Sequence, residues 1–485
     1  MSAPELRRAM GLWDLVLFNL TAIVGLRWLA TAARTGPSSL TLWVAAALLF
    51  FLPQGIAVLY LSSRYPEEGG IYRWTRRAFG DFHGFFCGWC YWVTNLVYYP
   101  SLLIFAAATA AYILGPDYVW LGERTWFTSL VALVLLWIAI GTNVVGLNVG
   151  KWLHNIGGLS TWLPGMLLIA LGAASYLRSG SATAMTPRAL VPALELGTLS
   201  FWSTIAFAFA GLELAPVMSG EIRDPRRNIP RALLLSSALI ALVYVAGTAA
   251  VLAVLSAREV NVVTGALQTI DAVVRRAGFG SVASLTALLL TLGSVGGTGA
   301  WLAGSARIPF VAGIDRFLPA AFGRVHPRWH TPHVAILTQG ILASLFLLLS
   351  LPGGTVAETY LLLSELTIII YFVPYLYLFF ALIRLHGSEP SQQGESVIPP
   401  PGGRAGTWAF GLTGAATTLL AILVSLIPSA EVARPWLYQA KLFGGTALFF
   451  GAGILLYRLR IAECGLRDTQ RRNHHRGTED TESSS

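Results

Sequence analysis

Apolar stretches recur along the whole chain, separated by short charged or proline-rich segments. A helix of about 20 apolar residues is long enough to cross the hydrocarbon core of a membrane. The pattern therefore predicts an all-α polytopic membrane protein with about twelve transmembrane helices. The predicted spans cover about residues 11–33, 40–62, 83–114, 126–145, 151–176, 199–221, 232–255, 281–311, 333–350, 355–382, 408–426 and 436–457.

The first span carries a positive charge near its centre. At about 1.5 Å of rise per residue, the membrane midplane lies about ten residues beyond Asp14. Val24, Gly25, Leu26 and Arg27 stand at that depth. An arginine there costs about 3 kcal/mol on insertion scales, so it requires an acidic partner, a cavity or a ligand. We therefore expect the first helix to be interrupted at this glycine.

The sixth span is interrupted by a similar set of residues. An apolar helix beginning near Leu199 reaches Gly211, Glu213 and Pro216 and becomes a charged loop beyond Met218. A broken helix is tolerated in a membrane only where the freed backbone groups face protein or a watery cavity, and many transporters build their binding sites from such breaks. A proline-kinked helix with a satisfied glutamate is the alternative interpretation.

The two interrupted spans each begin a set of five. The first set covers about residues 11–178 and the second about residues 197–386, and helices at about 408–457 follow. Because five is odd, the sets have opposite orientations in the membrane, which predicts a five-plus-five inverted repeat whose breaks meet near the midplane. We expect residues 1–460 to form one transmembrane domain. The polar segment 461–485, with His474 and His475, is expected to be a disordered, solvated tail.

Composition supports a membrane protein and argues against soluble classes. Hydrophobic residues make up 55% of the chain and charged residues 12%, and the mean hydropathy is +0.63. With a cytosolic N-terminus, roughly 23 Lys and Arg residues fall inside and about nine outside, as the positive-inside rule requires. The formal net charge of +9 is thus a sign of topology and does not imply nucleic-acid binding. The basic N-terminus leads into an uncleaved first helix.

No residue pattern indicates catalysis or metal binding. Cys87 and Cys90 form a C-x-x-C spacing inside an apolar helix, where a redox dithiol would lack access to solvent. The intramembrane acids are sparse and form no cluster with histidine. We therefore expect no metal, no cofactor and no enzymatic activity. A membrane-embedded enzyme acting on lipid or prenyl substrates is an alternative, which would need clustered acids or a nucleophile with its base.

Four motifs give the chain a family resemblance. They are GLWD at residues 11–14, PEEGGIYRW at 66–74, AFAFAGLE at 206–213 and GEIRDPRRNIPRA at 220–232. With these motifs the chain resembles the amino acid–polyamine–organocation superfamily of transporters over residues 9–460. The glutamate/GABA antiporter branch is the most similar, on LPGMLLIALGAA in the fifth span, REVNVVTGALQT at 258–269, and the later IPPPGGRAG and LVSLIPS.

The resemblance implies the LeuT-type fold and a substrate site between the two breaks. The unwound first helix would offer N–H groups to a carboxylate, and the unwound sixth helix would offer carbonyls to an amino group, as helix dipoles allow. Phe207 and Trp301 correspond to aromatic gates, and Asn95 offers an amide or an interhelical hydrogen bond. The substrate-binding residues implied are Val24, Gly25, Leu26, Arg27, Asn95, Phe207, Ala208, Phe209, Ala210, Gly211 and Trp301.

The chain departs from the family pattern at two places. Gly25-Leu26-Arg27 replaces a Gly-small-Gly run, which narrows the carboxylate cradle and adds a fixed charge. The fifth-span lysine of some proton-coupled members is also absent, since its place falls near residues 162–165. A lysine-based coupling mechanism is therefore not expected.

Several charged residues have more than one expected role. Arg27 either attracts an anionic substrate group, pairs with Glu213, or extends into a watery vestibule. Glu213 is a proton carrier, the partner of Arg27 or a cap on the broken helix, and Glu365 either takes part in coupling or bonds a neighbouring helix. Outside the membrane, Glu67, Glu68, Asp224 and Arg227 are expected to form ion pairs of an inner gate.

Taken together, the sequence predicts a secondary active transporter of amino acids or related amines. It would work by alternating access, as an exchanger or with proton coupling, in the plasma membrane (the inner membrane of a bacterium) with both termini cytosolic. The expected partners are the small-molecule substrate, possible coupling protons and the lipid bilayer. A membrane sensor that kept the fold without transporting is the alternative.

Overall fold

The computed structural model describes residues 8–193, 196–276, 278–315, 317–350, 355–386, 397–427, 432 and 434–482. These residues form a bundle of helices without a strand, as the apolar pattern predicts. Among the described residues, ten helices are long and apolar enough to cross a membrane. The shorter α16 (His333–Ser350) and the interrupted sixth span bring the described part of the chain into agreement with the expected twelve.

The first five spans begin with an interrupted helix. It consists of α1 (Leu12–Ile23) and α2 (Leu26–Ala33). The second span combines α3 (Ser38–Ala46), the π-helical turn η1 (Ala47–Phe51) and α4 (Leu52–Arg64). After the short α5 (Ile71–Phe79) come α6 (Asp81–Ala110), α7 (Thr125–Val145) and α8 (Leu147–Ser179), with the 3-10 turns η2 (Ala111–Leu114) and η3 (Pro116–Glu123) between α6 and α7.

The second five spans repeat this order. The short α9 (Pro187–Leu190) leads to the interrupted pair α10 (Leu196–Ala208) and α11 (Leu214–Val217), which the turn η4 (Ser219–Glu221) follows. Then come α12 (Pro225–Val254), α13 (Gly265–Arg276), α14 (Ser281–Ser305), α15 (Arg307–Ile314), η5 (Ala320–Gly323), α16 and α17 (Val356–Leu385). Breaks in both helices confirm the prediction made from Gly25 and Gly211.

Two further helices complete the fold. These are α18 (Gly403–Val424), which packs against α17, and α19 (Pro435–Glu482). The backbone of α19 stays helical to Glu482, across most of the segment for which composition predicts disorder. The physical reason is that a helix already nucleated extends at little cost through residues such as Arg, Gln and Glu.

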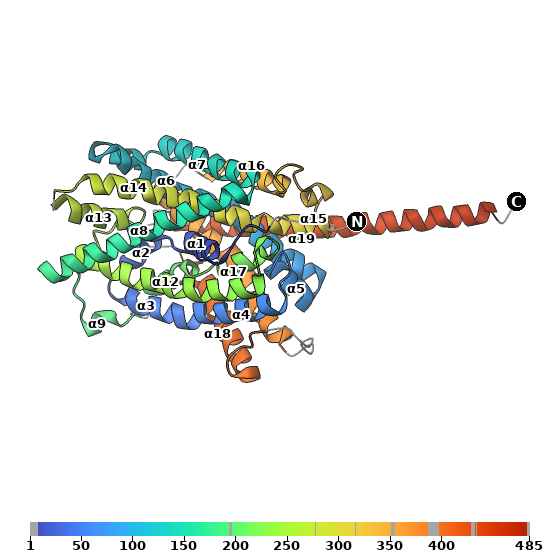
Figure 1. The fold of residues 1–485 in the computed structure, drawn as a ribbon, viewed down its shortest axis with the longest axis horizontal. Helices are drawn as coiled ribbons and strands as arrows, with labels where there is room; N and C mark the ends of the chain where they lie inside the picture. Colours follow the sequence, from blue (N-terminus) through green and yellow to red (C-terminus); the bar gives the residue numbers. More distant parts are fainter. Residues whose placement is uncertain are drawn as a thin grey trace.

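The arrangement places the first interrupted helix at the centre. In Figure 1, α5 and α15 lie at one end of the bundle, called here the α5 end, and α9 and α13 lie at the other, the α13 end. Helix α1 packs against α8, α12 and α14, and α14 also packs along α6 and α8. The unwound segments are therefore enclosed by helices that come from both halves of the chain.

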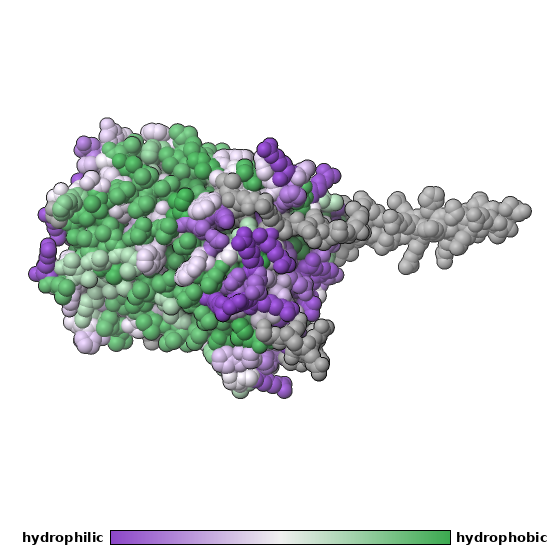
Figure 2. All heavy atoms as spheres, viewed as in Figure 1, coloured by the Kyte–Doolittle hydropathy of each residue, from purple (hydrophilic) through white to green (hydrophobic). Residues whose placement is uncertain are grey.

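The outer surface agrees with a membrane environment. Figure 2 shows hydrophobic side chains over the flank of the bundle and hydrophilic ones gathered near the α5 end. Many large apolar side chains on the lipid-facing helices are exposed, as expected where lipid replaces water. On α7 and α16 they include Trp126, Leu130, Val134, Trp137, Ile341, Leu345 and Leu348.

Candidate functional site

The first break lies between Ile23 and Leu26. Val24 and Gly25 adopt extended backbone angles, so the helix stops and starts again two residues later. A side chain at Gly25 would come within 2.8 Å of the Trp28 ring, which explains why a glycine stands there. The Gly25 N–H donates to the Tyr244 hydroxyl on α12 at 3.2 Å.

The second break lies directly against the first. Gly211 has φ +129°, a backbone conformation that favours glycine. A Cβ there would lie 2.9 Å from Ile23 Cγ1, so the two unwound segments touch. The Tyr244 hydroxyl joins them, since it donates to Ile23 O at 2.5 Å and lies 2.9 Å from Ala208 O. The breaks meet as the repeat pattern predicts, and α12 holds them together.

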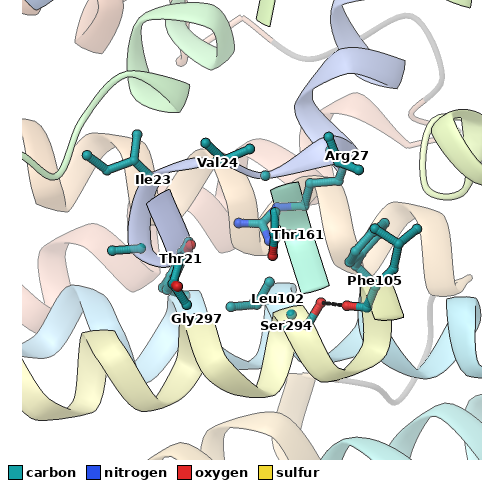
Figure 3. A pocket seen from close by; sticks show the side chains of 15 residues that line it. Thr21, Ile23, Val24, Arg27, Leu102, Phe105, Thr161, Ser294 and Gly297 are labelled. Atoms are coloured by element: carbon teal, nitrogen blue, oxygen red, sulfur yellow. Dashed lines mark hydrogen bonds between the residues drawn. The ribbon is translucent and has the colours of Figure 1, made fainter. Parts of the chain in front are cut away.

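A narrow pocket with an interior of about 20 Å³ opens beside the first break. Its walls come from the unwound segment of the first helix and from α6, α8 and α14, as Figure 3 shows. The lining residues are Thr21, Ala22, Ile23, Val24, Gly25, Leu26, Arg27, Tyr98, Leu102, Phe105, Thr161, Leu290, Gly293, Ser294 and Gly297. Since α14 begins next to α13, Leu290 marks the side of the pocket that faces the α13 end.

Arg27 extends into this pocket from the start of α2 (Figure 3). Its side chain is 1% exposed, and its Nε and Nη2 have no hydrogen-bond partner. The guanidinium carbon lies 4.3 Å from the Trp28 ring centre and 5.3 Å from that of Tyr98. Such cation–π contacts contribute about 0.5–2 kcal/mol each, whereas an unpaired buried charge costs several kcal/mol. The aromatic rings therefore do not replace an anionic partner.

Glu213 does not supply that partner. It is fully buried and accepts hydrogen bonds from the hydroxyls of Tyr371, Tyr375 (2.5 Å) and Tyr91 (3.1 Å) and from Gln54 Nε2 (3.2 Å). In the described part of the chain no carboxylate pairs with Arg27, so the expected Arg27–Glu213 pair is not formed. Glu213 stands at the N-cap of α11, but its side chain makes no capping hydrogen bond. It instead ties the second break to α4, α6 and α17.

An aromatic wall separates Glu213 from the pocket. Trp301 packs 5.4 Å from Tyr98 and 5.6 Å from Tyr371 between ring centres, and Phe207 lies 5.6 Å from Trp28. Trp301 Nε1 also donates to Ala22 O at 2.8 Å. Trp301, Tyr371 and Phe207 are buried behind the pocket and do not line it, whereas Tyr98 belongs to its lining.

The expected binding residues thus divide into two groups. Val24, Gly25, Leu26 and Arg27 line the pocket, whereas Asn95 and the segment 207–211 lie outside its lining. Asn95 is buried and its Nδ2 donates to Tyr91 O at 2.8 Å within α6, so this bond is not the interhelical hydrogen bond expected as the alternative. Sequence reasoning missed Tyr98, Thr161, Ser294 and Tyr244, because single hydroxyl-bearing residues inside long apolar spans carry no spacing signal.

Glu365 lies on α17, away from the pocket lining. Its Oε2 is buried without a hydrogen-bond partner. In the part of the chain that the structure describes, no hydrogen bond or ion pair joins it to Arg27 or Glu213, so a role in coupling stays a prediction.

A network of polar contacts closes the α5 end. Arg307, which is 2% exposed, contacts Glu221 Oε2 through Nε (2.8 Å) and Nη2 (2.6 Å). The chain before α1 pairs with the chain after η4, since Ala9 N donates to Glu221 O (2.9 Å) and Arg223 N donates to Met10 O (2.9 Å). Glu68 Oε2 accepts from Gly220 N–H at 2.7 Å. We call this set of contacts the α5-end closure.

The expected gate residues contribute unequally to this end. Glu68 takes part in the closure, whereas Glu67 forms an exposed pair with Arg77 at 3.1 Å. Asp224 lies at the N-cap of α12 with φ +44°, and the gate role expected of Asp224 and Arg227 stays a prediction. Sequence reasoning missed the Glu221–Arg307 pair and a second cluster, in which Asp315 contacts Arg73 (3.1 Å), Arg76 (2.8 Å) and Tyr72 (2.8 Å).

Glu68 makes the closure sensitive to pH. Burial, together with the nearby Glu221 charge, raises the pKa of Glu68 to about 8 from 4.5, against the opposing effects of Arg307 and the Gly220 N–H. In the closed arrangement the Glu68 carboxyl is protonated near neutral pH, and it loses this proton when opening exposes it to solvent. The stabilisation of the closed arrangement is therefore complete below about pH 4.5 and is lost as the pH rises through about 8.

We expect the apparent melting temperature of the purified protein to fall between pH 5 and pH 8.5 in the wild type. Glu68→Gln, which mimics the protonated carboxyl, should flatten this pH dependence. Glu67→Gln serves as the matched control, because Glu67 is next to Glu68 in the sequence but pairs with Arg77 at the surface. Equal slopes for the wild type and Glu68→Gln would contradict the assignment.

An all-helical membrane bundle in which two broken helices meet beside a pocket is the architecture of a membrane transporter. The sequence matches the amino acid permease family over residues 10–448, and the chain belongs to that family. It is therefore a multi-pass membrane transporter and not an enzyme.

Relatives are found over most of the chain. A transporter of Legionella pneumophila is 31% identical over 451 residues, covering 91% of this chain and 95% of the relative. A probable agmatine/putrescine antiporter of Lactococcus lactis is 24% identical over 363 residues, or 74% of this chain and 77% of the relative. A glutamate/gamma-aminobutyrate antiporter of the same organism is 24% identical over 394 residues, or 80% and 77%.

Proposed function

We propose that the chain is a secondary active transporter of amino acids or related amines that works by alternating access, as an exchanger or with proton coupling. The observation that carries the proposal is that two unwound segments lie against each other and that the first of them lines a pocket. A site at the junction of two broken helices opens to one side or the other when one set of helices moves against the other. The relatives named as antiporters support exchange.

The arrangement of the two ends fits one state of such a cycle. The α5-end closure seals one side of the breaks, and the pocket lies on the side that faces the α13 end. Arginines gather at the α5 end, so we infer from the positive-inside rule that this end and the N-terminus are cytosolic. These arginines include Arg64, Arg73, Arg76, Arg77, Arg223, Arg226, Arg227 and Arg231. The membrane we propose is the plasma membrane or its bacterial counterpart.

Counterflow in proteoliposomes tests the proposal. Vesicles containing the purified chain are preloaded with one unlabelled amino acid, and labelled acidic, neutral and basic amino acids are supplied outside at two pH values. We expect a transient accumulation of label that protein-free vesicles do not show. If no labelled solute accumulates although the solutes bind the purified protein, the transport proposal is contradicted.

A further inference from the structure

The charge of the pocket sets a preference among substrates. Among its fifteen lining residues, all in the described part of the chain, Arg27 alone carries a charge. Glu213 and Glu365, two acids of the surrounding helices, are absent from the lining. Glu213 is already bonded to three tyrosines and a glutamine. The empty site therefore holds one fixed positive charge with no fixed negative charge beside it.

The guanidinium is positioned to receive an anion. Its Nε and Nη2 have no partner, although the side chain is 1% exposed and directed into the pocket (Figure 3). Arg27 also stands in the first turn of the eight-residue helix α2, whose N-terminal end favours negative charge. A planar guanidinium matches a carboxylate through paired hydrogen bonds.

The acceptors that would bind an ammonium group are largely occupied. Ile23 O and Ala208 O, freed at the two breaks, both face the Tyr244 hydroxyl, and Ala22 O accepts from Trp301. The hydroxyls of Thr21 and Ser294 donate to carbonyls of their own helices and keep lone pairs for a substrate N–H. An amino group is thus accommodated by neutral hydroxyls, while a carboxylate meets a full charge.

We propose that the pocket selects substrates with net negative charge, such as acidic amino acids, and that Arg27 binds one of their carboxylates. This assignment rests on the transport function proposed above and adds to it the charge class of the substrate. A monoanion cancels the charge of the site, whereas a zwitterion leaves it positive and a cationic amine adds a second positive charge. Diamines are therefore the least favoured substrates of this chain.

The test uses three five-carbon α-amino acids that differ only at the side-chain end. Glutamate, glutamine and ornithine compete in counterflow with the labelled solute that accumulates best, and the thermal stabilisation of the detergent-purified protein by each is measured in parallel. We expect glutamate to inhibit at concentrations at least about tenfold lower than glutamine, with ornithine weakest. Glutamate should also give the largest stabilisation.

Variants connect the preference to Arg27. Arg27→Gln should abolish the glutamate preference over glutamine, and Arg27→Lys should keep its direction with weaker binding, because lysine retains the charge without the planar fork. Arg178→Gln is the matched control, since it removes the same charge from an exposed site at the end of α8. Thermal unfolding without solute shows whether each variant is folded.

The outcomes separate the two proposals. Exchange of glutamine or ornithine with equal or better affinity than glutamate, or an unchanged preference in a folded Arg27→Gln, overturns the charge class and leaves the transport function intact. Stabilisation by glutamate without counterflow of any solute supports the charge class and contradicts transport. Stabilisation by potassium chloride equal to that by potassium glutamate assigns the guanidinium to an inorganic anion and overturns the proposal.

Discussion

Glu213→Ala is expected to destabilise the protein by about 3 kcal/mol and to reduce counterflow by at least about tenfold. The carboxylate is the shared acceptor of Tyr91, Tyr371, Tyr375 and Gln54. An interhelical hydrogen bond in a membrane protein averages about 0.6 kcal/mol, so four of them exceed about 2 kcal/mol. Buried hydroxyls left without an acceptor add to this cost.

Transport suffers because the same cluster positions the second break. The Tyr375 hydroxyl, held by Glu213, also accepts the Gly211 N–H at 2.7 Å, so the orientation of the unwound backbone depends on the carboxylate. Loss of Glu213 releases this backbone group and loosens the segment that lies against Ile23. The effect should therefore appear in both folding and turnover.

Thermal unfolding in detergent and counterflow in vesicles check this prediction together. Glu213→Gln keeps the shape and one acceptor oxygen, so it should lose less stability than Glu213→Ala. Glu123→Gln, at the exposed last residue of η3, controls for removal of an acidic charge. Wild-type stability in Glu213→Ala would show that the tyrosines find other acceptors and that the carboxylate does not organise the break.

Glu221→Gln is expected to have the second large effect, by opening the α5 end. Glu221 and Arg307 are 3% and 2% exposed, and the substitution leaves the guanidinium buried without its carboxylate. Removing one partner of a buried ion pair typically costs about 3–5 kcal/mol. The exposed pair Glu67–Arg77 is expected to contribute less than about 1 kcal/mol, so Glu67→Gln is a matched control.

Glu221 is part of the α5-end closure, so Glu221→Gln should also make the residues of the closure more accessible to solvent. Ser219, 2% exposed and two residues from Glu221, is replaced by cysteine in a chain whose three native cysteines are serine. We expect a membrane-impermeant maleimide to label this cysteine at least about tenfold faster in Glu221→Gln, since that factor corresponds to about 1.4 kcal/mol. Labelling at the wild-type rate would contradict the role of the pair as a gate.

A double variant isolates the interaction between the two residues. Glu221→Gln combined with Arg307→Gln removes both charges, so the loss of stability should be smaller than the sum of the two single losses. Additive losses would mean that each side chain is stabilised by separate neighbours. Arg307 also donates to Ala303 O within its own helix, and the double variant accounts for this contact.

The closure and the pocket belong to one physical scheme. In the proposed cycle, a substrate entering from the α13 side would meet Arg27 in front of a wall of aromatic rings, and its way to the other side would pass the second break and the closure. The raised pKa of Glu68 makes release of a proton part of opening that end. The pH dependence of counterflow in Glu68→Gln, compared with the wild type, therefore distinguishes simple exchange from proton coupling.

The sequence by itself determined the fold class and the positions of the breaks. Apolar stretches long enough for a membrane, a glycine beside an arginine at the first midplane, and Gly211 near Glu213 and Pro216 sufficed, because these signals depend on local geometry and on the cost of burying charge. The same reasoning placed Arg27 where the structure has it, at the wall of a pocket.

Only the tertiary structure decided the partners of these residues. Glu213 bonds tyrosines from two other spans, Tyr244 joins the breaks from α12, and Glu221 pairs with Arg307 across 86 positions of the chain. Such contacts depend on how distant helices rotate and pack, and single polar residues in apolar spans leave no periodic trace of that packing. The sequence therefore allowed a pair between Arg27 and Glu213, whereas in the folded chain Arg27 faces a pocket whose lining contains no acidic side chain.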